Sequence, residues 1–215
     1  MMNLAHTSFM FVQKDLEHIV RYLNEGKIIA YPTETLWGLG VDISNPEAVD
    51  SLFKLKERPN NKPVSVLVAD KRMALEHAYL DESDEQLIDL FWPGPLTLVL
   101  PIKETIPPKI HAYSNMVGLR CSSHPFVRSV LRKFKKPIST TSANRSGHPP
   151  AHSKRDLIWC PDSVIVVDDD TKCIKNPGST VLQKVKDGYE IIREGQIEAK
   201  MLQQFVNIKN MAEFY

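Results

Sequence analysis

The sequence lacks three features that would each point to a particular class of protein. It has no excess of charge, because 27 Lys and Arg residues are matched by 26 Asp and Glu residues, so a global field that drives nonspecific nucleic-acid binding is excluded. Its three cysteines are an odd number without C-x-x-C spacing, which argues against a disulfide framework and a structural zinc site. No segment approaches the roughly 20 apolar residues of a membrane span. We therefore expect a cytoplasmic protein without membrane contact.

Common catalytic and nucleotide-binding motifs are also missing. The chain contains neither G-x-x-x-x-G-K-[ST] nor G-x-G-x-x-G, and it has no G-x-S-x-G elbow. These absences remove two usual phosphate cradles but do not exclude nucleotide binding. His148 and His152 are four residues apart, yet Pro149 and Pro150 prevent the regular helix that would aim both rings at one metal ion. We predict no resident metal site.

What the sequence does contain is a regular alternation of helix and strand signals. The predicted helices are 14–24, 71–79, 85–91, 126–134 and 199–206. One more helix is predicted to begin at a cap formed by Ser44 or Asn45 and to end near Lys56. The predicted strands are 28–31, 64–69, 96–100, 117–121, 138–141, 163–167, 179–182 and 189–193, and a polar turn is expected from 33 toward Gly38 and Gly40. No repeat or linker appears, so residues 1–215 are predicted to form a single mixed α/β domain.

Two short polar patterns are candidates for phosphate binding. Lys56 and Arg58 lie two residues apart where a helical pattern stops at Pro59, and together they could meet a polyphosphate from one side. A solvated helix end is the commoner explanation of such a pair. Ser142 and Asn144 follow a strand and could donate hydrogen bonds to phosphate oxygens or a ribose, or could form a capping turn.

Three further signals each allow two interpretations. The Thr33 hydroxyl could hold a polar substrate or form a turn. Arg120 lies within an apolar strand pattern, so it must reach solvent or pair with an anion, either a protein carboxylate or a ligand carboxylate. The neighbouring signals favour the ligand. The basic run Arg132, Lys133, Lys135 and Lys136 could touch RNA phosphates, although a solvated helix end is the better explanation.

Seven motifs, taken together in order, resemble the YrdC-type family and, within it, the threonylcarbamoyl-AMP synthase branch. They are 31–35 (YPTET), 38–40 (GLG), 56–59 (KERP), 92–97 (WPGPLT), 118–120 (GLR), 141–147 (TSANRSG) and 179–181 (STV). The similarity runs from about Asp15 to Gly195. It implies an open, twisted mixed α/β sheet with flanking helices and a concave ligand-binding face. It also implies a reaction in which L-threonine, bicarbonate or CO2, and ATP yield threonylcarbamoyl-AMP and pyrophosphate, for threonylcarbamoyladenosine in tRNA.

The resemblance also implies a role for individual residues. The catalytic set would be Lys56, Arg58, Ser142 and Asn144. The ATP-binding residues would be Lys56, Asn60, Met116, Ser142, Pro150 and Arg193, and the threonine-binding residues would be Thr33, Ser65, Arg120, Thr140 and Ser179. Mg2+ is expected to accompany the nucleotide. The implied partners are downstream threonylcarbamoyl-transfer proteins and, by direct contact, tRNA; because the sequence ends at Tyr215, no additional C-terminal domain is expected.

Two other functions remain open at this point. One is a non-catalytic RNA-binding module that uses the basic run from Arg132 to Lys136. The other is a carbamoyl-transfer domain of the hydrogenase-maturation type, which would use carbamoyl phosphate in place of threonine. The chain lacks the companion acylphosphatase and zinc-finger segments, and this absence weighs against the second alternative.

Overall fold

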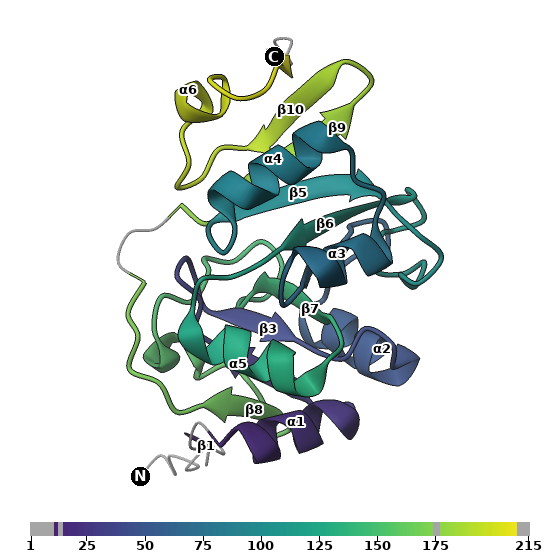
Figure 1. Cartoon of the computed structure of the whole chain (residues 1–215). Coiled ribbons are helices and arrows are strands. Elements are labelled where there is room, and N and C mark those ends of the chain that lie inside the picture. The colour runs from purple at the N-terminus through teal and green to yellow at the C-terminus, as the bar shows by residue number, and fades with distance from the viewer. Residues whose placement is uncertain (1–10, 13–14, 174–176, 210–215) are drawn as a thin grey trace, which may run out of the picture.

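A computed structural model describes residues 11–12, 15–173 and 177–209, and its centre is one mixed sheet (Figure 1). In spatial order, the strands are β1 (Phe11–Val12), β8 (Val164–Val167), β2 (Ile28–Tyr31), β3 (Gly38–Gly40), β7 (Ile138–Ser142), β4 (Ser65–Leu67), β6 (Met116–Arg120), β5 (Leu96–Pro101), β9 (Thr180–Val185), β10 (Gly188–Arg193) and β11 (Ile208–Lys209). Both parallel and antiparallel pairs occur. The predicted mixed α/β fold is therefore confirmed.

Strand β7 lies in the interior of the sheet. It joins one part, formed by β1, β8, β2 and β3, to the other part, formed by β4, β6, β5, β9, β10 and β11. It runs antiparallel to β3 on one side, where Gly38 faces Ser142, and antiparallel to β4 on the other, where Ser65 faces Thr140. The predicted polar turn at 33–35 is present, since the Thr33 hydroxyl accepts from the amides of Thr35 and Leu36. The Gly38–Gly40 segment to which it leads is a strand, which was not predicted from the sequence. Glycine is needed there for close approach: a Cβ on Gly40 would lie 2.4 Å from the backbone oxygen of Ser139.

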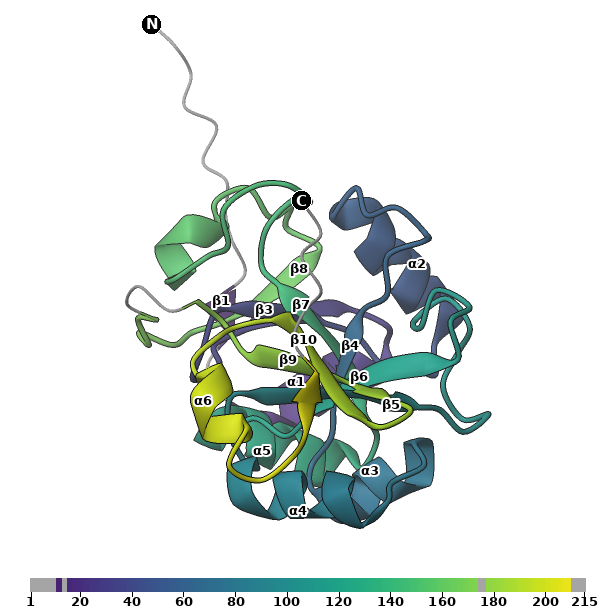
Figure 2. The same cartoon turned by 90° about the horizontal axis from the view of Figure 1, so that it is seen from above.

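The helices lie on both faces of the sheet, with α1, α3, α4 and α5 on one face and α2 on the other (Figures 1 and 2). They are α1 (Leu16–Asn24), α2 (Pro46–Leu55), α3 (Lys71–His77), α4 (Glu82–Phe91), α5 (Pro125–Phe134) and α6 (Ala199–Leu202), with a short 3-10 turn, η1 (Lys154–Leu157). Asn45, one of the two predicted caps, caps α2 by accepting a hydrogen bond from the Ala48 amide at 3.0 Å. The predicted helix 199–206 is wrong in length, since α6 ends at Leu202.

Apolar side chains fill the space on both faces of the sheet. In β2, Ile28 and Ala30 belong to one buried cluster, while Ile29 and Tyr31 belong to another. This alternation explains why the strand reads as a continuous apolar run, since both of its faces are covered. Among the described residues, no helix combines the length and the apolar character needed to cross a membrane.

Candidate ligand pocket

A pocket of about 220 Å³ lies where β7 ends and is walled by residues from both parts of the sheet. The predicted site residues that line it are Thr33, Arg58, Ser65, Arg120, Thr140, Ser142, Ser179 and Arg193. The predicted site residues that do not line it are Lys56, Asn60, Met116, Asn144 and Pro150. The topology explains the grouping, because β4 and β3 are the direct neighbours of β7 and each contributes a strand end or its adjoining loop.

Lys56, the residue after α2, is buried, with an exposed fraction of 1%. Its Nζ donates hydrogen bonds to the backbone oxygens of Ser142 (2.5 Å) and Asn144 (2.6 Å) and to Oδ1 of Asn144 (3.0 Å). Burial, helped by the nearby charge of Arg58, lowers the pKa of Lys56 from 10.5 to about 7. All three ammonium donors are therefore committed to the turn that follows β7.

The turn from Ser142 to Asn144 is held by its own side chains as well. Ser142 Oγ donates to Asn144 Oδ1 at 2.7 Å, and Asn144 Nδ2 donates to the backbone oxygen of His148 at 2.5 Å. The capping-turn interpretation therefore describes part of what these residues do. Ser142 also lines the pocket, so a ligand contact by its hydroxyl stays a prediction.

Two of the three arginines that line the pocket bond to neutral oxygens. Arg58 donates from Nη2 to the backbone oxygen of Pro63 at 2.5 Å, and Arg193 donates from Nη2 to the backbone oxygen and Oγ of Ser179 at 2.8 and 3.1 Å. Burial lowers the pKa of both guanidinium groups. Within the described ranges, no carboxylate lies within ion-pair distance of either arginine or of Lys56. Arg58 and Arg193 thus line the pocket, and Lys56 lies behind the turn after β7, without acidic partners in the described part of the chain.

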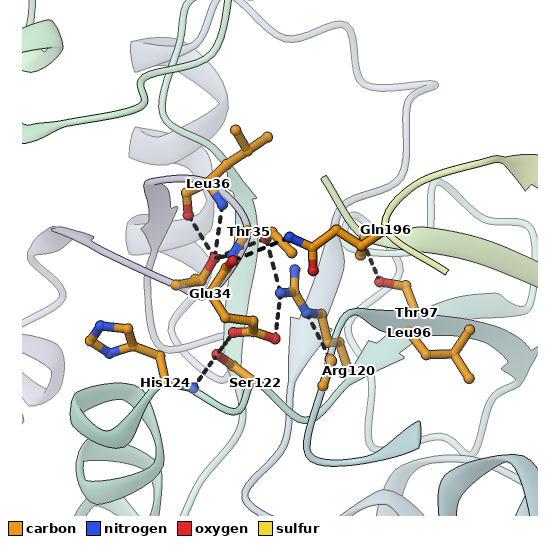
Figure 3. A network of polar contacts seen from close by, with 12 residues as sticks. Glu34, Thr35, Leu36, Leu96, Thr97, Arg120, Ser122, His124 and Gln196 are labelled. Atoms are coloured by element: carbon orange, nitrogen blue, oxygen red, sulfur yellow. Dashed lines mark hydrogen bonds and ion pairs between the residues drawn. The ribbon is translucent and has the colours of Figure 1, made fainter. Parts of the chain in front are cut away.

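Arg120, the last residue of β6, has an acidic partner. Its Nη2 lies 2.8 Å from Glu34 Oε1 and 2.9 Å from Thr35 Oγ1, and its Nε donates to the backbone oxygen of Gly94 at 3.4 Å (Figure 3). The sequence favoured a ligand carboxylate as the partner of Arg120. The structure supplies a protein carboxylate, which was the other alternative, and contact with a ligand stays a prediction.

The pocket also carries several hydroxyl groups, which are already hydrogen-bonded within the protein. Thr33 Oγ1 donates to the backbone oxygen of Leu36 at 2.6 Å and accepts from two amides of its own loop at 3.1 Å, so the turn interpretation of Thr33 is confirmed. Ser179 Oγ lies 2.9 Å from Thr97 Oγ1. The sequence interpretation did not single out Thr35 and Thr97, which line the pocket, or Glu34, which pairs with Arg120. Glu34 and Thr35 are polar residues that follow the Pro32 break, and this was the signal that could have found them.

Asn60, Met116 and Pro150 lie outside the pocket lining. Asn60 is exposed in the loop after α2. Met116 lines a neighbouring cleft of about 430 Å³ that shares Ser65 with the pocket. Pro150 is half-buried and precedes Ala151, whose amide donates to the backbone oxygen of Ala143 at 3.1 Å. The predicted ATP contacts of these three residues stay predictions.

The basic run at the end of α5 is partly neutralised by other segments. Lys133 pairs with Glu17 of α1, and Lys136 lies 2.8 Å from Asp42 Oδ2. A surface lysine that is already paired with a carboxylate attracts phosphate more weakly. This arrangement favours the solvated helix end over an RNA-binding surface.

Together, the fold and the pocket define an α/β protein with a pocket lined by arginines and hydroxyl-bearing side chains at the middle of its sheet. Residues 21–195 match the sequence model of the Sua5/YciO/YrdC family, which carries the description "Telomere recombination". The chain belongs to this family. The predicted YrdC-type resemblance is therefore confirmed.

Two curated relatives and one solved structure are similar to this chain. A threonylcarbamoyl-AMP synthase of Photobacterium profundum is 39% identical over 63% of this chain and 75% of its own length. A threonylcarbamoyl-AMP synthase of Vibrio campbellii is 35% identical over 67% of this chain and 80% of its own length. The crystal structure of P. abyssi Sua5 complexed with L-threonine superposes with a TM-score of 0.84 at 28% identity. The match covers 94% of this chain but 63% of that protein.

Proposed function

We propose that this chain is an L-threonylcarbamoyladenylate synthase, a nucleotidyltransferase that forms threonylcarbamoyl-AMP and pyrophosphate from L-threonine, bicarbonate or CO2, and ATP, for the modification of tRNA. The observation that carries the proposal is a set of three cations without acidic partners among the described residues. Arg58 and Arg193 line the pocket, and Lys56 holds the turn that follows β7. Lys56 is buried, Arg58 is half-buried and Arg193 is exposed, and a buried charge without a counter-ion is costly. Such an arrangement fits a site whose counter-ion is a polyanionic ligand.

The phosphates of ATP would lie against Arg58 and the turn after β7. The guanidinium of Arg58 and the hydroxyl of Ser142 both line the pocket and can donate hydrogen bonds to phosphoryl oxygens. Lys56 would act from beneath, because its ammonium holds the backbone oxygens of Ser142 and Asn144 and adds a positive charge directly behind the turn. Catalysis of this kind consists of positioning and of neutralising charge on the phosphoryl group.

L-threonine would occupy the part of the pocket lined by hydroxyl groups. Arg120 would bind its carboxylate, and the side chain would contact a wall formed by Thr33, Ser65, Thr140 and Ser179. The amino group would add to CO2 to form a carbamate with release of one proton, and an oxygen of that carbamate would attack the α-phosphorus. The bond from that phosphorus to the β-bridging oxygen breaks, and pyrophosphate leaves with its electron pair.

The remaining nucleotide contacts would come from the rim. Arg193 lines the pocket beside Ser179, and Asn60, Met116 and Pro150 would contact the nucleotide outside the phosphates. The described pocket lining contains no Asp or Glu, so it does not fit a resident magnesium ion, which prefers carboxylate oxygens. We therefore assign Mg2+ to the ATP phosphates and not to a protein-bound site.

The product would pass to other components. Threonylcarbamoyl-AMP is a mixed anhydride, so a downstream threonylcarbamoyl-transfer protein would carry it to tRNA, and direct contact between this chain and tRNA is a further proposal. We assign the activity to the cytoplasm. The three cysteines are buried free thiols, which fits a reducing compartment.

The test is a pyrophosphate-release assay with purified protein. Release is expected only when ATP, L-threonine and bicarbonate are all present, and mass spectrometry of the adenylate should give threonylcarbamoyl-AMP. Release driven by carbamoyl phosphate without threonine would favour the carbamoyl-transfer alternative. A salt-sensitive tRNA affinity without any pyrophosphate release would favour the RNA-binding alternative. Either result would end the synthase proposal.

A further inference from the structure

The carboxylate of Glu34 lies against Arg120, although no acidic residue lines the described pocket itself. Glu34 Oε1 accepts from Arg120 Nη2 at 2.8 Å, and its Oε2 accepts from the hydroxyl of Ser122 (Figure 3). The side chains of Glu34 and Arg120 are 18% and 7% exposed. Burial by itself raises the pKa of Glu34, but the charge and hydrogen bonds of Arg120, with the Ser122 hydroxyl, hold it below its usual value. Glu34 is therefore ionised at neutral pH.

The backbone that carries Glu34 is fixed independently of this ion pair. Thr33 Oγ1 accepts hydrogen bonds from the amides of Thr35 and Leu36, both at 3.1 Å. The backbone oxygen of Glu34 accepts from Nε2 of Gln196, on the segment after β10, at 3.4 Å (Figure 3). The Glu34 carboxylate thus extends from a rigid loop, and it can impose a direction on the longer, more flexible arginine.

The contacts of Arg120 leave one part of its guanidinium for a ligand. Nε is engaged by the backbone oxygen of Gly94, and Nη2 by Glu34 and Thr35. Within the described ranges, Nη1 makes no hydrogen bond, and Arg120 lines the pocket. A guanidinium is planar, so fixing two of its nitrogens also fixes the direction of the third.

We propose that Glu34 is a positioning residue that orients Arg120 toward the carboxylate of the amino-acid substrate. The inference rests on the proposed function, because it assumes that Arg120 meets an amino-acid carboxylate. It assigns to Glu34 an effect on the amino-acid substrate and none on ATP. It also predicts that the hydrogen-bond geometry of Glu34 matters more than its charge, since the charge of Glu34 opposes that of the incoming carboxylate.

The test compares Glu34→Ala and Glu34→Gln with the wild type, by direct calorimetric binding of L-threonine and by steady-state kinetics. Glu34→Ala is expected to weaken threonine binding and raise the KM for threonine by about tenfold or more, as loss of a buried charge partner does. The KM for ATP should stay within about twofold. Glu34→Gln keeps an oxygen that can accept from Arg120, so it should restore binding to within about threefold of the wild type.

A second ligand separates orientation of Arg120 from general damage to the fold. Threoninamide lacks the carboxylate, so it should bind more weakly than threonine to the wild type. Its affinity should be the same for Glu34→Ala and the wild type. The variant should therefore lose the preference for threonine over threoninamide. Glu17→Ala is the matched control, because Glu17 is also paired with a cation, Lys133, but is 76% exposed and lies on α1. If Glu34→Ala does not fold, Ser122→Ala leaves the acid in place, removes one of its hydrogen bonds and should weaken threonine binding by about threefold.

The possible outcomes distinguish this inference from the proposed function. Unchanged threonine binding in Glu34→Ala, or an equal loss for threonine and threoninamide, overturns the role of Glu34 while the synthase proposal stands. A Glu34→Gln variant as weak as Glu34→Ala also overturns the orienting role. If the wild type binds threonine but releases no pyrophosphate, the synthase proposal fails and the binding comparison still decides the role of Glu34. A wild type that binds no threonine overturns both.

Discussion

Replacing Lys56 by methionine should separate the activity of this protein from its stability. Methionine keeps the length of the side chain but has no charge and no N–H donor. A pKa that falls from 10.5 to about 7 in the folded protein corresponds to about 5 kcal/mol of cost for the buried ammonium at low pH. The variant avoids this cost but loses three hydrogen bonds to the 142–144 turn, each worth about 1–3 kcal/mol with a charged donor. At pH 7, we expect a change in the free energy of unfolding that lies between a gain of about 2 and a loss of about 4 kcal/mol.

The sign of the pH dependence makes this prediction sharp. Between about pH 7 and pH 10.5, the unfolded chain still binds the proton of Lys56 while the folded chain has released it, so the wild type becomes more stable as the pH rises. Lys56→Met lacks this gain. Relative to the wild type, the variant should therefore lose about 4 kcal/mol between pH 7 and pH 10.

The assays are urea denaturation at several pH values and pyrophosphate release at pH 6, below the pKa of about 7, where the ammonium of Lys56 is charged. Activity should fall by about 2–4 kcal/mol in transition-state stabilisation, because the charge behind the turn is gone. Lys54→Met is the control, because Lys54 is an exposed lysine in the last turn of α2. It should change neither the free energy of unfolding nor the rate of pyrophosphate release. A difference in unfolding free energy between Lys56→Met and the wild type that stays constant from pH 7 to pH 10 would refute this account of the buried ammonium.

Three other substitutions test separate parts of the structure. Arg58→Lys should lower kcat/KM in the pyrophosphate assay by about 10- to 100-fold, since an ammonium cannot reproduce the planar fork; a rate within about twofold of the wild type would contradict the role of Arg58. Asp84→Ala removes a buried carboxylate that accepts from Tyr189 Oη at 2.6 Å and Lys184 Nζ at 2.5 Å, so denaturation should reveal a loss of about 3–5 kcal/mol. Gly40→Ala would put a Cβ 2.4 Å from a backbone oxygen of β7 and should cost about 1–3 kcal/mol or more; an unchanged melting temperature would show that β3 can shift at little cost.

Much of the fold could be predicted from the sequence because its signals are local. The helices from Leu16 and Pro46 carry apolar residues at helical spacing behind a capping side chain, and buried strands such as β2 are short apolar runs. Strand β3 could not be found in this way. Two of its three residues are glycines, and only the close approach of β7 explains why they are extended.

The residues that line the pocket were predictable from the sequence only in part, and their contacts were not predictable. The family resemblance predicted Arg58, Ser142 and Arg193 as site residues, and all three line one pocket. It did not predict that Lys56 would be buried and hydrogen-bonded to residues 86 and 88 positions away. The ion pair of Arg120 with Glu34 also spans 86 positions. Such partners depend on the strand order, which the local pattern does not encode.

The parallel pairing of β9 with β5 has a consequence for the order in which the protein can fold during synthesis. On the ribosome, β2 to β7 emerge first, and most of the central strands can pair before residue 150 has left the exit tunnel. Ser179 and Arg193 emerge much later, with β9 and β10, and β8 must still insert between β1 and β2. A nascent chain therefore possesses most of its core before it possesses a pocket. In a chain that terminates before β9, the edge of β5 would stay open to pairing with other chains.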